Sequence, residues 1–183
     1  LGSIETNAHL IKYDSTHGIL NQDVKTTKEG FQIGDQNIKV FGERDPAKLN
    51  WKKVGADVVL ECTGFFLDKA SAGKHIEAGA KKVIISAPAK EVDFTLVQGV
   101  NSKELNKNHN IISNGSCTTN CLAPVAMVLE KNFGITYGYM TTIHSYTGDQ
   151  KLLDTLHKDL RRARATEGSM IPTSTGAAKA MSL

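Results

Sequence analysis

The sequence lacks the features of a membrane protein or of a secreted, disulfide-rich protein. No apolar run approaches the roughly 20 residues that a membrane-spanning helix needs, and the first residues are too polar for a secretory signal. Its three cysteines are an odd number spread along a chain of medium length, which does not suggest a disulfide framework. We therefore expect the protein to work in a reducing compartment, the cytoplasm.

A strong charge of one sign is also absent. The 22 Lys and Arg residues against 19 Asp and Glu residues leave a net charge of +3, which is no general nucleic-acid footprint. The 40% hydrophobic content is enough for a globular core. An initial Met is missing, and the helix-favouring run Ala178–Leu183 has no capping glycine or proline after it. We expect an internal piece of a longer protein, cut at both ends.

A Gly-x-Gly-x-x-Gly fingerprint is missing as well, yet the apolar pattern predicts an α/β fold. Asp57–Cys62 and Lys82–Ser86 are short apolar runs, and Ala70–Ala78 between them has the composition of a helix. Strand, crossover helix and strand in this order predict a right-handed βαβ unit, whose parallel strands are buried on both faces. Ligands of such sheets bind beyond the carboxyl ends of the strands.

Other segments extend this pattern. Further strands are predicted at 94–97, 110–113 and 137–143, and a hairpin with alternating inward residues is predicted at 31–33 and 38–40. The end of a helix is predicted at 8–13, the start of a helix at Asp45-Pro46, and a helix at 122–133. Gly134 is its predicted stop, and Pro124 should sit in its first turn or bend it. Polarity and loop content rise after His144, and we place a domain boundary near Gly115.

Cys117 is the first candidate for chemistry. A cysteine at the start of a helix gains from the free amide donors and from the positive end of the helix dipole, which favour thiolate over thiol. His144 follows 27 residues later, at the end of a predicted strand, and a Cys-His pair is a common way to hold a reactive thiolate. From position alone, a packed cysteine and a structural histidine remain alternatives.

The remaining candidates are weaker. Cys121 lies one helical turn after Cys117, but no further Cys/His pair at zinc spacing accompanies these two, so we expect no metal site and interpret Cys121 and Cys62 as packed residues. The stretch after His144 is dense in hydroxyls and guanidiniums, the groups that bind phosphate. A solvated loop with surface ion pairs is the alternative reading of this stretch.

The run Ser113–Cys121 closely resembles the active-site signature of phosphorylating glyceraldehyde-3-phosphate dehydrogenases, except that Gly115 stands where Ala is usual. Other segments resemble that family in the same order: 12–18, 43–46, 61–64, 141–144, 159–164 and 171–179. The resemblance covers essentially the whole chain. It implies a partial Rossmann-type NAD-binding domain at 1–115, lacking its first βαβ part, followed by the start of an α+β catalytic domain at 116–183.

The resemblance also implies a reaction and a set of site residues. Cys117 would be the nucleophile and His144 the base in the NAD-dependent oxidative phosphorylation of glyceraldehyde 3-phosphate to 1,3-bisphosphoglycerate, a step of glycolysis. Residues implied to bind substrate or phosphate are Ser116, Thr118, Thr147, Arg162, Thr175 and Gly176, and those implied to contact the cofactor are Arg44, Thr63, Gly64 and Ser86. A cytoplasmic homotetramer is the implied assembly.

Several alternatives stay open. Erythrose-4-phosphate dehydrogenase is a similar sister enzyme, although its relatives typically differ around Tyr146–Gly148 and Thr175-Gly176. Two alternative hypotheses come from other functional classes. The protein could be a cysteine acyltransferase or hydrolase, or a non-catalytic binding protein. NADP is not excluded, because the acidic residue that selects between the coenzymes in the family would precede Leu1. We expect this chain alone to be inactive.

Overall fold

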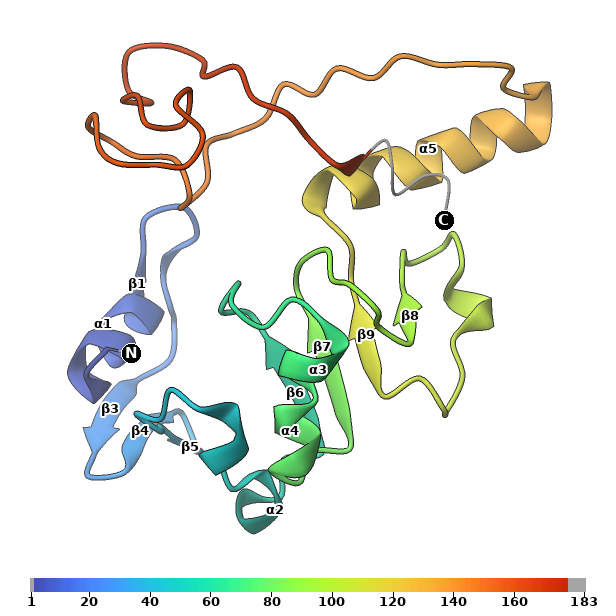
Figure 1. Ribbon diagram of the computed structural model, residues 1–183. Coiled ribbons are helices and arrows are strands. Elements are labelled where there is room, and N and C mark those ends of the chain that lie inside the picture. The colour runs from blue at the N-terminus through green and yellow to red at the C-terminus, as the bar shows by residue number, and fades with distance from the viewer. Residues whose placement is uncertain (1, 178–183) are drawn as a thin grey trace. The chain divides into compact units, whose positions relative to one another are not determined.

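The computed structural model describes residues 2–177, which contain five α-helices, two 3₁₀ helices and nine strands (Figure 1). The run Ala178–Leu183 lies outside the described residues. The chain divides into two compact units. The first comprises the residues up to Val59 together with Ala70–Val83, and the second comprises Leu60–Lys69 together with the residues from Ile84 onward.

The first unit begins with a helix and two antiparallel sheets. Helix α1, Ile4–Lys12, starts at Ser3, whose hydroxyl accepts a hydrogen bond from the Thr6 amide. Strands β1 (Tyr13–Asp14) and β2 (Gly18–Ile19) pair with each other, and β3 (Val24–Thr27), β4 (Gly30–Ile33) and β5 (Gln36–Lys39) form a three-stranded sheet. The predicted hairpin is confirmed, but its alternation is wrong, since every residue of β5 is exposed.

Short helices follow in the same unit. The 3₁₀ helix η1, Pro46–Lys48, begins at Asp45, whose carboxylate accepts from the Ala47 amide, as the sequence predicts. Helix α2 is Trp51–Val54, and α4 is Lys74–Glu77. The indole N–H of Trp51 donates to Nδ1 of the buried His75 at 3.1 Å.

The predicted helix Ala70–Ala78 is in fact two short helices. These are α3, Lys69–Ala72, and α4, and Gly73 lies between them as the N-cap of α4. Glycine costs about 1 kcal/mol in a helix interior relative to alanine, which accounts for a break at this residue.

A four-stranded sheet has the order β6-β7-β9-β8, formed by β6 (Val58–Glu61), β7 (Lys82–Ile85), β9 (Ile111–Ser113) and β8 (Phe94–Thr95). Strands β8 and β9 are parallel. The Lys82 amide donates to Asp57 and the Ser86 amide to Glu61, so β6 and β7 also run in the same direction. The predicted parallel sheet is therefore confirmed.

The expectation that these strands are buried on both faces is wrong for β6. Val58 is 53% exposed and Leu60 66% exposed, whereas Val59 and Glu61 are buried. Strand β7 has Val83 and Ile85 fully buried, and these two side chains lie at the centre of the sheet's core.

The second unit continues from this sheet into helix α5, Cys117–Phe133, after the 3₁₀ helix η2, Ser102–Glu104. The α5 helix begins five residues before the predicted start, so Pro124 lies inside it, and Gly134 ends it as predicted. Residues 134–176 contain no helix or strand. The predicted strand 137–143 is wrong, because strands need a hydrogen-bonded neighbour and no described strand pairs with it.

No helix within residues 2–177 is both long and apolar enough to cross a membrane.

Candidate active site

Cys117 is the first residue of helix α5. Ser116 precedes it as the N-cap, and its hydroxyl accepts a hydrogen bond from the Thr119 amide at 2.9 Å. The hydroxyls of Ser116 and Thr119 are also 2.7 Å apart. The thiol therefore lies at a capped helix N-terminus, where free amide donors and the helix dipole stabilise negative charge.

The loop between β9 and α5 is held by side-chain hydrogen bonds. The Asn120 amide group donates to the carbonyl of Asn114 at 2.7 Å and to that of Ser116 at 2.9 Å. The Gly115 amide donates to the Ser113 hydroxyl at 3.0 Å, and Gly115 has φ +64°, a conformation that glycine adopts without a steric penalty. These contacts fix the backbone that carries the thiol.

His144 lies beside this thiol. Its Nε2 is 3.1 Å from Sγ of Cys117, and its Nδ1 is 2.7 Å from the carbonyl oxygen of Ser145. A carbonyl only accepts, so Nδ1 carries a proton and Nε2 faces the sulfur. In the neutral pair Nε2 accepts from the thiol, and after proton transfer the imidazolium donates to the thiolate. Both residues are exposed, so a substrate can reach the sulfur.

The two groups change each other's acidity. Partial burial raises the pKa of Cys117, but the hydrogen bond from His144 and the Thr118 amide outweigh burial, and the pKa lies below its ordinary value. The carbonyl of Ser145 raises the pKa of His144 most, followed by the hydrogen bond to Cys117. These shifts favour the thiolate–imidazolium form, in which the sulfur is a ready nucleophile.

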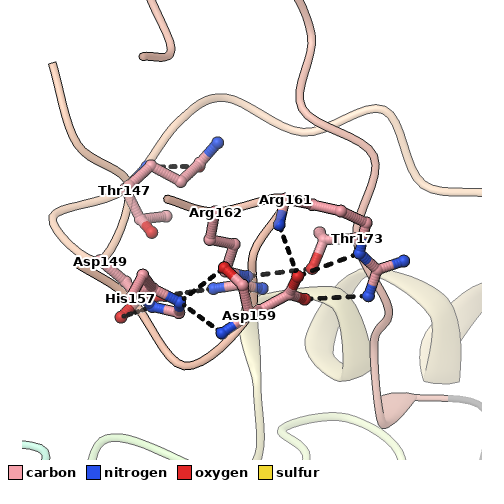
Figure 2. Close-up of polar contacts among 8 residues, drawn as sticks. Thr147, Asp149, His157, Asp159, Arg161, Arg162 and Thr173 are labelled. Atoms are coloured by element: carbon pink, nitrogen blue, oxygen red, sulfur yellow. Dashed lines mark hydrogen bonds and ion pairs between the residues drawn. The ribbon is translucent and has the colours of Figure 1, made fainter. Parts of the chain in front are cut away.

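The polar stretch after His144 forms a hydrogen-bonded cluster (Figure 2). Arg162 donates through Nε to the Thr173 hydroxyl at 2.9 Å and through Nη1 to Oδ2 of Asp149. The amide of Thr147 donates to the Gln150 side chain at 3.0 Å. The hydrogen bond from Arg162, with a second from His157, holds the pKa of Asp149 below its ordinary value. The predicted phosphate residue Arg162 is thus fixed and already paired.

The other predicted phosphate residues are less tightly connected to one another. Thr175 accepts at its hydroxyl from the Ala177 amide at 3.2 Å, Gly176 has open space around its Cα, and Thr118 lies next to the thiol. No hydrogen bond within residues 2–177 joins Ser116 to Arg162, Thr147 or Thr175. Among the predicted site residues, His144 and Thr118 both interact with the Cys117 thiol through their side chains.

Three predicted cofactor residues follow the ends of neighbouring strands. Thr63 and Gly64 come after β6, and Ser86 comes after β7, so all three lie past carboxyl ends of parallel strands. The hydroxyl and amide of Thr63 both donate to the Glu61 carboxylate. Gly64 has φ +75° and nothing within 4 Å of where a Cβ would be, so it leaves room for a ligand against the backbone. Arg44 is an exposed residue of the first unit.

A metal centre receives no support in residues 2–177, where no group of three or more His, Cys, Asp or Glu side chains is arranged to hold an ion. Cys62 and Cys121, predicted as packed residues, are free and exposed.

Comparison with known proteins matches two sequence models of one family. Residues 1–69 match "Glyceraldehyde 3-phosphate dehydrogenase, NAD binding domain", and residues 116–183 match "Glyceraldehyde 3-phosphate dehydrogenase, C-terminal domain". The chain belongs to the glyceraldehyde-3-phosphate dehydrogenase family.

Curated relatives of this family are similar along nearly the whole chain. Glyceraldehyde-3-phosphate dehydrogenase 1 of Bacillus subtilis is 59% identical over 96% of this chain and 53% of its own length. The enzymes of the same name from Xanthobacter flavus and Geobacillus stearothermophilus are each 56% identical over 100% of this chain and 55% of their own. The chain thus spans about half the length of the curated relatives it matches.

Some residues that shape the candidate site were not singled out from the sequence. Asn120 was noted only as part of the family signature, although its side chain bridges the loop before the nucleophile. Gln150 and His157 were not singled out at all. The available signal is the charge pattern, since three aspartates precede three arginines between Asp149 and Arg164, and polar side chains among them are natural hydrogen-bond partners.

Proposed function

We propose that the complete protein containing this chain is an NAD-dependent oxidoreductase that converts glyceraldehyde 3-phosphate and inorganic phosphate to 1,3-bisphosphoglycerate. The observation that carries this proposal is the 3.1 Å contact between Cys117 Sγ and His144 Nε2 at the start of α5. Family membership supports the substrate, since the relatives carry the name of that activity.

The thiolate of Cys117 attacks the aldehyde carbon, and the carbonyl oxygen takes the proton that His144 Nε2 holds. The product is a thiohemiacetal bound through a new C–S bond. Nε2 then accepts the hydroxyl proton while the aldehyde hydrogen leaves with its electron pair, so a carbonyl reforms and a thioester remains on Cys117. NAD, when bound, supplies the acceptor for that hydride.

Inorganic phosphate completes the reaction. One of its oxygens attacks the thioester carbon, the C–S bond breaks, and the sulfur leaves as the thiolate that His144 stabilises. We assign Ser116, Thr118, Arg162, Thr175 and Gly176 to this phosphate and Thr147 to the phosphate of the substrate. Their chemistry supports the assignment, because hydroxyls, a guanidinium and backbone amides near a helix start all donate to anions.

NAD would be held by Thr63, Gly64 and Ser86, with Arg44 contributing. Their place past the ends of β6 and β7 and the open space at Gly64 fit a nucleotide on the edge of a parallel sheet. The matched NAD binding domain supports this coenzyme.

The remaining assignments follow the family. We propose a partial NAD-binding domain at 1–115 and a partial catalytic domain at 116–183, supported by the match that begins at residue 116. We also propose a homotetramer in the cytoplasm, and we expect the chain alone to be inactive. Erythrose 4-phosphate is not favoured as the substrate, since the relatives are named for glyceraldehyde 3-phosphate.

The test is a spectrophotometric assay of the complete protein with NAD and glyceraldehyde 3-phosphate. Continuous NAD reduction that needs inorganic phosphate, with slow turnover of erythrose 4-phosphate, is the expected result. Equal turnover without phosphate would assign water as the acyl acceptor and reject the proposal.

A further inference from the structure

His157 belongs to the cluster in Figure 2, and its side chain is the least exposed of the basic side chains there that pair with a carboxylate. The His157 side chain is 17% exposed, against 53% for Asp149. Nε2 of His157 is 3.3 Å from Oδ1 of Asp149, and the Asp159 amide donates to Nδ1 at 2.9 Å.

The carboxylate partner places a proton on Nε2. A carboxylate only accepts, so the contact of Nε2 with Oδ1 of Asp149 needs a proton on that nitrogen, while Nδ1 lies 2.9 Å from the Asp159 amide nitrogen and 3.2 Å from the Asp159 carbonyl oxygen. The Nε2–H group therefore points its hydrogen bond at Oδ1 of Asp149. Asp149 uses its other oxygen, Oδ2, to accept from Nη1 of Arg162.

This arrangement leaves most of Arg162 available. A guanidinium has five N–H donors, and Arg162 uses one on Thr173 and one on Asp149. The others remain for an anion. A neighbouring pair shows the alternative, a bidentate ion pair between Asp159 and Arg161. Oδ1 of Asp159 is 3.0 Å from Nε of Arg161, and Oδ2 is 2.9 Å from Nη2. Oδ1 of Asp159 also accepts from the Arg161 amide at 2.9 Å, but no side chain within residues 2–177 other than Arg161 binds this carboxylate, and the bidentate pair forms.

We infer that His157 is a positioning residue that keeps Asp149 from forming a bidentate pair with Arg162, and so keeps the arginine open to inorganic phosphate. The inference rests on the proposed function, in which Arg162 binds the attacking phosphate. By occupying Oδ1, His157 limits Asp149 to one hydrogen bond with Arg162. That single hydrogen bond still sets the plane of the guanidinium. Without the Nε2 donor, the carboxylate would turn onto Arg162 and compete with phosphate for its donors.

Two variants of the complete protein test whether His157 positions Asp149 through a hydrogen bond or only fills space in the loop. His157→Gln keeps a donor that reaches Asp149, whereas the shorter side chain of His157→Asn keeps an acceptor for the Asp159 amide but does not reach Asp149. We expect His157→Asn to raise the KM for inorganic phosphate about tenfold, the effect of one charge-assisted hydrogen bond, and His157→Gln to restore it. The KM for glyceraldehyde 3-phosphate and the burst of NAD reduction without phosphate should stay unchanged in both.

A double-mutant cycle of His157 and Asp149 tests whether His157 acts through the Asp149 carboxylate. In an Asp149→Asn background no carboxylate is present to pair with Arg162, so adding His157→Asn should change the phosphate KM no further. Equal phosphate KM values in His157→Asn and the unaltered protein, equal losses in both His157 variants, or a change confined to the aldehyde KM would each overturn the inference. A missing burst in the unaltered protein would instead reject the proposed function itself.

Discussion

Nε2 of His144 lies 3.1 Å from Sγ of Cys117 although 27 residues separate them in the chain. The helix start of α5 fixes the sulfur, and a loop with no regular structure brings the imidazole to it. The lowered pKa of the thiol and the raised pKa of the imidazole follow from this one contact together with the Ser145 carbonyl and the Thr118 amide.

The first prediction concerns the acidity of the thiol. In a variant with Cys62 and Cys121 replaced by serine, the rate of Cys117 alkylation by iodoacetamide is measured against pH. The midpoint, the pH at which this rate is half-maximal, should lie below the ordinary thiol pKa of 9.0. The rate should fall as pH drops through that lowered pKa, because the thiolate becomes protonated. His144→Asn should move the midpoint up toward the ordinary value. An unmoved midpoint in this variant would show that the imidazole does not stabilise the thiolate.

A second prediction concerns the loop that carries the thiol. Asn120→Ala removes two hydrogen bonds, to Asn114 and Ser116, and should lower stability by about 1–2 kcal/mol and slow Cys117 alkylation. Asn132→Ala is the matched control, since its side chain makes one similar bond to the Val128 carbonyl in the same helix, away from the thiol. Urea unfolding and alkylation rates measure both effects. Equal alkylation rates in the two variants would rule out a role of the loop.

A third prediction separates two adjacent arginines. Arg162→Ala should raise the phosphate KM of the complete protein about 10- to 100-fold, because charged hydrogen bonds to the anion are lost. Arg161→Ala removes the same charge one position earlier, but Arg161 is paired to Asp159 with both oxygens. We expect it to change the phosphate KM little. Steady-state kinetics with varied phosphate decides, and similar losses in both would reduce the effect to general charge.

A fourth prediction concerns acid stability. Burial raises the pKa of Asp93, but the Lys69 ammonium at 2.6 Å and the Ile111 and Asn110 amides outweigh it and hold the pKa at about 2. The value in the unfolded chain is 3.8, so the carboxylate stabilises the fold above that pH, and this contribution is lost as pH falls through about 2.

Asp93→Asn should therefore lower the free energy of unfolding at neutral pH by about 1–3 kcal/mol and flatten its dependence on acid pH. Asp57→Asn is the control, because the Lys81–Asp57 pair is solvent-exposed and should contribute less than about 1 kcal/mol. Chemical denaturation at several pH values measures both. The same loss in the two variants would contradict a special role for Asp93.

The sequence was sufficient for the elements whose signals are local. The parallel strands at Val58–Glu61 and Lys82–Ile85, the Asp45 cap and the Gly34-Asp35 hairpin all follow from short-range patterns, and each is present. The position of Cys117 at a helix start was likewise predicted, although the predicted range of that helix began five residues too late.

The failures come from interactions that no local pattern encodes. Residues 137–143 are rich in Tyr, Thr and Ile, which favour strands, but a strand exists only through its neighbour, and they pair with no described strand. Gly73, which divides the predicted helix, is an exception, because its low helix propensity is a local signal. The contacts of His157 with Asp149 and Asp159 depend on how a loop folds back on itself, which spacing does not fix.

The most direct test of the central claim is to trap the acyl group. The complete protein is mixed with glyceraldehyde 3-phosphate and NAD in the absence of inorganic phosphate, quenched in acid, digested and analysed by mass spectrometry. The phosphoglyceroyl group is predicted on the peptide that contains Cys117, on the sulfur of that residue and not on Cys121, and should be absent in Cys117→Ser. An acyl group on another residue, or NAD reduction that persists in Cys117→Ser, would contradict the assignment of Cys117 as the nucleophile.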